Sequence, residues 1–115
     1  MAKTSSLAVQ RWEGLAEKTH YRVGDLADAC NMSVRHLERQ FRQELGRTPQ
    51  NWLDELRRLA AQQRLLSGDP EKNVASALGF KQESHFCRKF KQWTGITPTA
   101  FVAASSLAAR NVANR

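Results

Sequence analysis

SVRHLERQFRQELGRTP, residues 33–49, decides the fold, because QESHFCRKFKQWTGITP, residues 82–98, nearly repeats it after a shift of 49 positions. The identical pairs are His36 and His85, Arg39 and Arg88, Phe41 and Phe90, Gln43 and Gln92, Gly46 and Gly95, and Thr-Pro at 48–49 and 97–98. A self-match at one fixed shift indicates a single supersecondary unit used twice.

Each copy predicts an amphipathic helix, at residues 33–45 and 82–94. In the first copy the apolar positions recur every three or four residues, at Val34, Leu37, Phe41 and Leu45. Ser33 is placed to cap this helix, Gly46 to end it, and Thr48-Pro49 to start the next one. Phe86, Phe90 and Trp93 form the corresponding stripe of the second copy, with Phe80 expected beneath it.

A short helix is expected before each copy, at residues 22–29 and around residues 70–78, which makes each half a helix-turn-helix. Asn31 suits the left-handed turn between the first pair, and the second turn is one residue longer. A helix over residues 5–18 begins at Ser5 or Ser6 and contributes Trp12 to the core, and Asp69-Pro70 is expected to cap the helix that follows.

The pattern as a whole predicts an all-α fold with no strand. We expect an N-terminal helix-turn-helix lobe (5–48), a long linker helix (49–67), a C-terminal helix-turn-helix lobe (68–108) and a frayed tail (109–115). The linker stretch has no Gly and no Pro after Pro49, and 18 helical residues span roughly 27 Å.

Positive charge is concentrated in the two copies. The 115-residue chain has a formal net charge of +7. The net charge is +2 for residues 33–47, +3 for residues 81–95 and zero for residues 1–32. A basic surface of this kind indicates a polyanionic partner, nucleic acid first and an anionic membrane second.

The second helix of a helix-turn-helix enters the DNA major groove, which returns to the same side of the duplex about every 34 Å. Two recognition helices on one chain can therefore lie in successive major grooves of double-stranded DNA, and because the two helices differ at positions that would read bases, they predict an asymmetric site.

The motifs Leu26-Ala27 with Gly46-x-Thr-Pro, and Leu78-Gly79-Phe80 with Gly95-Ile96-Thr97-Pro98, resemble the DNA-binding domain of AraC/XylS-type bacterial transcription regulators. The resemblance covers about residues 10–101. It implies seven helices in two helix-turn-helix lobes joined by a long helix, one domain bound to an asymmetric DNA sequence, and contact with RNA polymerase. The chain departs from the family pattern at recognition-helix positions, with acidic Glu38 and Glu83 and the thiol of Cys87.

The candidate DNA-binding residues are polar or basic positions of the two helices: Arg35, His36, Arg39, Arg42, Gln82, Ser84, His85, Arg88 and Lys91. Arg39 and Arg88 are the strongest candidates for base contact, because arginine can bond guanine O6 and N7 together. Arg35 and Ser84 lie one turn earlier, while Arg42 and Lys91 are expected at phosphate or in solvent. Gln82 is either a ligand or part of the turn. The histidines are interpreted as phosphate contacts or solvated residues.

Two mismatched positions are expected to let each half read its own sequence: Arg35 against Ser84 and Glu38 against Cys87. Glu38 either accepts a hydrogen bond from cytosine or pairs with Arg35 or Arg42, and the pairing is favoured. Cys30 is expected in the core. A redox switch at Cys87 is disfavoured, because no resolving cysteine accompanies it.

No cofactor, metal site or enzyme activity is expected. Neither cysteine has a metal-ligand spacing to a histidine, and no Ser/His/Asp set or glycine-rich phosphate loop is present. No signal peptide or long apolar run occurs, so we expect a cytoplasmic protein that does not enter a membrane. The alternative function is a basic helical module that binds an acidic protein without reading DNA. We expect a sensing domain outside this chain, in preference to a stand-alone regulator.

Overall fold

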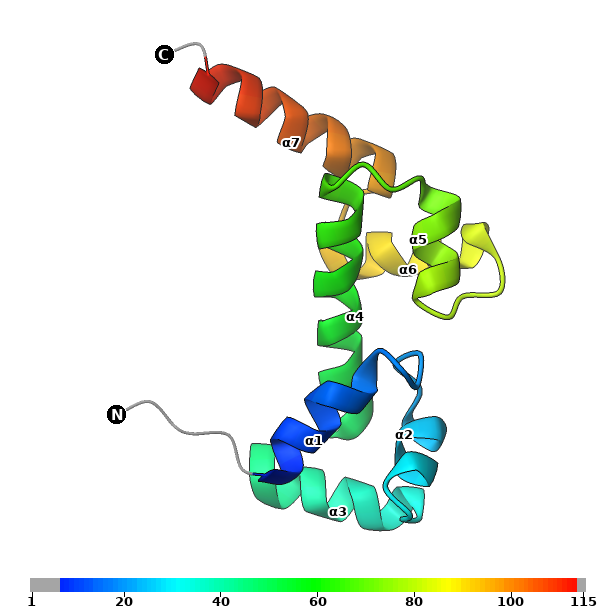
Figure 1. The fold of residues 1–115 in the computed structure, drawn as a ribbon. Coiled ribbons are helices and arrows are strands. Elements are labelled where there is room, and N and C mark those ends of the chain that lie inside the picture. The colour runs from blue at the N-terminus through cyan, green and yellow to red at the C-terminus, as the bar shows by residue number, and fades with distance from the viewer. Residues whose placement is uncertain (1–6, 114–115) are drawn as a thin grey trace. The chain divides into compact units, whose positions relative to one another are not determined.

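The computed structural model describes residues 7–113, with side chains described through residue 107. Over that span the chain forms seven α-helices and no strand (Figure 1). They are α1 (Leu7–Ala16), α2 (Val23–Ala29), α3 (Val34–Leu45), α4 (Pro49–Leu66), α5 (Glu71–Ala77), α6 (Glu83–Thr94) and α7 (Pro98–Ala113). The predicted all-α fold with two helix-turn-helix lobes and a long linker helix is confirmed. None of the helices in the described span is long and apolar enough to cross a membrane.

The chain divides inside α4, where one compact unit ends at Arg57 and the other begins at Arg58. The long helix is therefore shared between the units, whereas the sequence had suggested a linker distinct from both lobes. α7 is helical through Ala113, although residues 109–115 were expected to form a frayed tail; residues 114 and 115 lie outside the described span. The cap expected at Ser5 or Ser6 also lies outside it.

The Gly-x-Thr-Pro segments form matching corners in the two units. Gly46 and Gly95 adopt left-handed conformations with φ of 68° and 87°, as the C-caps of α3 and α6. Thr48 Oγ1 accepts a hydrogen bond of 3.1 Å from the backbone N–H of Asn51. Thr97 Oγ1 accepts one of the same length from the backbone N–H of Ala100. The caps therefore satisfy backbone donors that the first turns of α4 and α7 would otherwise leave free.

The turns inside the two helix-turn-helix units are also as expected. Ser33 Oγ accepts a 3.0 Å hydrogen bond from the backbone N–H of His36, and Asn31 has a φ of 57°. Residues 30–33 separate α2 from α3, and residues 78–82 separate α5 from α6, so the second turn is one residue longer. One expectation is wrong: Pro70 is the N-cap of α5 without a side-chain hydrogen bond, because the Asp69 carboxylate instead lies 3.5 Å from Arg64.

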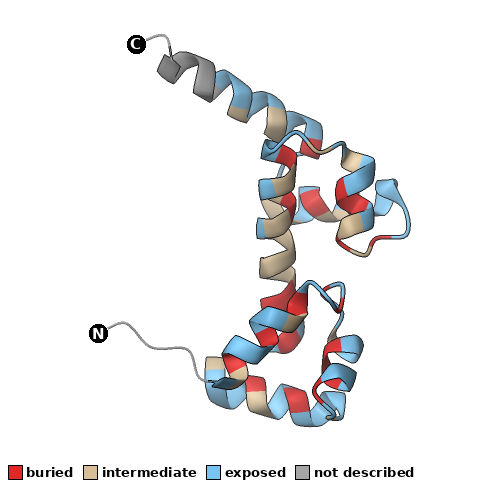
Figure 2. Cartoon of the chain, viewed as in Figure 1, coloured by how far each residue is buried: buried red, intermediate tan, exposed pale blue. Residues whose placement is uncertain are grey.

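The core of the first unit is built on three aromatic rings from α1, α3 and α4. Trp12 stacks on Phe41, and Trp52 meets both rings edge-on, with centroids 6.4 Å and 5.2 Å away. Leu26 and Leu37 are completely buried and Cys30 is 5% exposed, so the core assignments of Trp12 and Cys30 are confirmed. Figure 2 shows buried positions on all of the helices of this unit. The apolar side of α3 therefore packs against α1 and α4.

The second unit has an equivalent core formed by phenylalanines. Phe86 and Phe90 on α6 are completely buried, and Phe80 from the preceding turn packs 5.5 Å from Phe86. Phe101 from α7 meets Phe90 edge-on at the same centroid distance. The expected place of Phe80 beneath α6 is confirmed.

Candidate nucleic-acid interface

The outward face of α3 carries three arginines. One residue turns an α-helix by about 100°, so Arg35, Arg39 and Arg42 fall within a sector of about 60° opposite the buried Leu37. All three side chains are exposed, and none of them forms an ion pair within the described part of the chain. They are therefore available to an anionic partner.

The outward face of α6 repeats this arrangement with different side chains. Ser84, Arg88 and Lys91 occupy the positions of the three α3 arginines after the shift of 49 residues, and all three are exposed. The buried Phe86 and Phe90 lie on the other side of the helix. The structure thus brings six of the nine candidate residues onto two matching faces. We call these faces the α3 face (Arg35, Arg39, Arg42) and the α6 face (Ser84, Arg88, Lys91).

The remaining three candidates lie beside the two faces. His36 and His85 are exposed. Each lies about 100° around its helix from the buried residue that follows it, Leu37 or Phe86. The His85 ring also meets Phe80 edge-on, with centroids 5.2 Å apart. Gln82 is the N-cap of α6 and has an extended backbone, so it belongs to the end of the turn.

Glu38 does not form the ion pair that the sequence favoured. It is exposed, and no hydrogen bond or ion pair joins it to Arg35 or Arg42 among the residues the structure describes. The helical spacing permits such a pair, but an exposed pair gains little free energy and costs side-chain entropy. Both arginine side chains therefore remain available to an anionic partner.

Cys87 differs from Glu38, the exposed residue at the matching position of α3, because it contacts a neighbouring helix. A difference in base reading between these two positions stays a prediction. The Cys87 side chain is half-buried and its Sγ donates a 3.3 Å hydrogen bond to Oε1 of Glu71 on α5. Burial, followed by the hydrogen bond to this carboxylate, raises the pKa of the Cys87 thiol from 9.0 to about 11. The thiol is protonated at neutral pH and is a weak nucleophile, which also argues against a redox switch.

One group of possible metal ligands occurs in the described span, at Glu71, Glu83 and Cys87, whose ligand atoms lie within 4.8 Å of one another. A cysteine binds metal as a thiolate, and the raised pKa of Cys87 opposes loss of its proton. The group therefore gives no argument for a metal centre.

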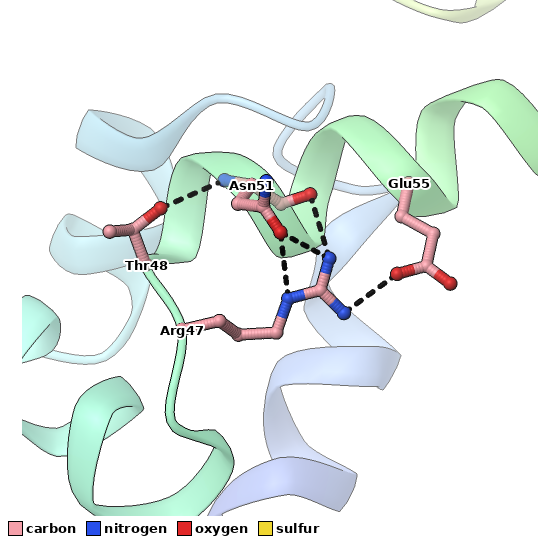
Figure 3. A network of polar contacts seen from close by, with 4 residues as sticks. All are labelled: Arg47, Thr48, Asn51 and Glu55. Carbon is pink, nitrogen blue, oxygen red and sulfur yellow. Dashed lines mark hydrogen bonds and ion pairs between the residues drawn. The ribbon is translucent and has the colours of Figure 1, made fainter.

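Arg47 has a structural role that sequence reasoning missed. Figure 3 shows its guanidinium between two residues of the first turns of α4. Nε donates to Oδ1 of Asn51 at 2.9 Å, Nη2 donates to the same oxygen and to the Asn51 carbonyl at 3.3 Å, and Nη1 lies 2.7 Å from Oε1 of Glu55. The available signal was the spacing of four and eight residues from Arg47, in the turn before α4, to Asn51 and Glu55, which lie one turn apart on α4. Arg47 contributes to the positive charge of the first copy, but Glu55 compensates it locally.

Comparison with known proteins agrees with this architecture. The family model described as a helix-turn-helix domain matches residues 26–104. The transcriptional activator RhaS of Pectobacterium carotovorum is 40% identical over 70 residues, which are 60% of this chain and 25% of that protein. The chain thus spans about a quarter of the length of this curated relative.

Two solved structures share the fold at appreciable identity. A transcriptional regulator with an AraC-type DNA-binding domain from Chromobacterium violaceum superposes with a TM-score of 0.66 at 30% identity, covering 82% of this chain and 88% of that one. The DNA-binding domain of AdpA, solved with a target DNA, gives a TM-score of 0.71 at 32% identity, covering 88% and 93%. The chain therefore belongs to the family of helix-turn-helix domains found in AraC-type transcription regulators.

Proposed function

We propose that the chain is the sequence-specific double-stranded DNA-binding module of a bacterial transcription regulator that acts in the cytoplasm, and that it is not an enzyme. The observation that carries the proposal is the pair of matching, exposed basic faces on α3 and α6, which form no ion pair with any residue that the structure describes. The DNA complex of the AdpA domain, a relative of the same fold, supports it.

Each face combines two kinds of contact with DNA. Arg39 and Arg88 enter the major groove and bond guanine O6 and N7, which gives about 1–3 kcal/mol of discrimination per base pair. Arg42 and Lys91, nearer the helix ends, contact phosphates and supply affinity that depends on salt rather than on sequence. His36, His85 and Gln82 flank the faces and contact the backbone.

The two faces read different sequences. Arg35 on α3 corresponds to Ser84 on α6, so one half presents two arginines in its first turns where the other presents one. α4 is 18 residues long without an internal Gly or Pro, and α3 and α6 enter successive major grooves of one asymmetric site.

The rest of the regulator supplies control and output. Because the chain matches about a quarter of RhaS, a transcriptional activator, we assign a sensing domain to the part of the protein outside this chain, and contact with RNA polymerase to the bound complex.

Selection of duplexes from a random pool, followed by competition at fixed salt, tests the proposed function. The selected duplex is expected to bind at least about a thousandfold more tightly than random DNA. Equal affinity for all duplexes would instead favour a binder of acidic surfaces. A perfect inverted repeat bound by a dimer would contradict the asymmetric site.

A further inference from the structure

The carboxylate of Glu71 links three helices of the second unit. Glu71 is the first residue of α5, and its Oε1 accepts the 3.3 Å hydrogen bond from Cys87 of α6. Its Oε2 accepts a 2.7 Å hydrogen bond from Oγ1 of Thr99 in the first turn of α7. One charged side chain therefore ties the recognition helix to the helices before and after it.

Among the described residues of the first unit, 7–57, this link has no equivalent. The repeat aligns Glu71 with Val23, Cys87 with Glu38 and Thr99 with Gln50. A valine side chain accepts no hydrogen bond. The Gln50 amide donates instead to Asp54, at 2.9 Å within its own helix. The link thus belongs to one copy of a duplicated unit and is not required to build the helix-turn-helix itself.

The link adds directional contacts to the apolar contacts that hold α6. Phe86 and Phe90 hold α6 against the second core, but apolar burial has little directional preference. Hydrogen bonds are directional, and the bond from the Thr99 hydroxyl to this carboxylate is of the charge-assisted kind, about twice as strong as one between neutral groups, whereas the Cys87 thiol is a weaker donor. Cys87 directly precedes Arg88, so a bond that fixes the direction of residue 87 also fixes that of residue 88, about 100° further around the helix.

We propose that Glu71 is a positioning residue that fixes the rotation of α6 about its axis, through Cys87 and Thr99, and so aims Arg88 and Ser84 at their bases. The inference rests on the proposed DNA-binding function and adds a source of specificity that touches no DNA. The α3 face, which has Val23 at the corresponding place, is aimed by its apolar contacts alone.

The test compares base discrimination in the two halves of the selected site. The Arg39→Ala and Arg88→Ala variants first define which base pairs the α3 and α6 faces read. Glu71→Val, which installs the residue of the first copy, is expected to lower discrimination about tenfold at the Arg88-dependent base pairs and to leave the Arg39-dependent ones unchanged. Glu71→Gln keeps the shape and an acceptor oxygen, and is expected to restore most of the discrimination.

The control for charge is Glu13→Gln, since Glu13 is an exposed carboxylate on α1 and the change also removes one negative charge. It is expected to change binding to all duplexes alike. A second readout is alkylation of Cys87 at pH 8.5, which is expected to be faster in Glu71→Val than in the wild type because the thiol has lost its partner.

The outcomes separate the inference from the proposed function. A wild-type chain that selects no sequence would overturn both. A wild-type chain that selects a site, together with a Glu71→Val variant that keeps all base preferences while losing only thermal stability, would overturn the positioning role alone. Equal loss of discrimination in both halves would also contradict it.

Discussion

The indole of Trp12 lies stacked on the ring of Phe41, with centroids 3.8 Å apart and planes inclined by 15°. This pair joins α1 to the recognition helix of the first unit. Phe41→Ala is expected to lower the free energy of unfolding by about 3–5 kcal/mol, because it removes a completely buried ring and leaves a cavity. Urea denaturation followed by tryptophan fluorescence measures this. Phe41→Leu, which keeps most of the volume, should cost clearly less.

Arg39→Ala and Arg88→Ala are expected to relax specificity at different base pairs. Each should lose about 1–3 kcal/mol of discrimination at one base pair and little elsewhere, because each variant removes the bidentate contact to guanine that we propose. Competition with single-base variants of the selected duplex measures the effect. A uniform loss over all duplexes would make these residues phosphate contacts.

Arg47→Ala is expected to leave the salt dependence of DNA binding unchanged, although Arg47 is part of a basic segment. Its charge is held by Glu55, so it should release no counterions on binding. Arg42→Ala, the matched control on the exposed face, should reduce the slope of log K against log salt by about 0.9. Arg47→Ala should instead lower stability by roughly 0.5–1.5 kcal/mol through the lost contacts to Asn51 and Glu55. An equal fall in slope for both variants would place Arg47 on the DNA.

Alanine at two glycines is expected to act in opposite directions. A Cβ at Gly14 or Gly46 meets no atom within 4 Å, so the backbone decides both effects. Gly14 lies inside α1, where alanine should stabilise the chain by about 0.5–1 kcal/mol. Gly46 has a φ of 68°, where alanine should cost about 1–2 kcal/mol. Thermal unfolding of both variants gives the two signs, and a stabilised Gly46→Ala would show that the corner can relax.

Alkylation of Cys87 is expected to follow the raised pKa of its thiol. In the folded chain the rate with iodoacetamide should rise with a midpoint near pH 11, against about 9 after denaturation. Between these values the folded state retains a proton that the unfolded state has lost, so stability should fall as the pH rises through this window. Cys87→Ser should lack this part of the decline. Buried Cys30 should stay unmodified in the folded chain.

The fold could be predicted from local features that act over a few residues. The repeat, the spacing of Leu37 and Phe41, and the Gly-x-Thr-Pro corners each determine structure without distant partners. The same spacing put Arg39 and Arg88 on exposed faces. Helical periodicity was therefore sufficient for the fold and for the two faces.

The remaining features depended on contacts between helices. Cys87 lies at the border between the buried and exposed sides of α6, and its hydrogen-bond partner, Glu71, lies on α5, 16 residues away in the sequence. Asp69 stands next to a helix start but pairs with Arg64. Glu38 has suitable neighbours on its own helix yet makes no ion pair in the described structure. The spacing of residues along the chain shows which partners each side chain could reach, but it does not show which of these partners the side chain contacts.

The corners show where a duplicated unit was free to diverge. In each Gly-x-Thr-Pro corner the glycine ends one helix, and the threonine and proline begin the next. The position between glycine and threonine has no such role in setting the path of the backbone. The first copy uses that position for Arg47 and its contacts, whereas the second has Ile96, which is 38% exposed. After a duplication, mutations at this position could accumulate without unfolding either copy. Protein engineers could vary the same residue to adjust the rigidity of a corner while preserving its path.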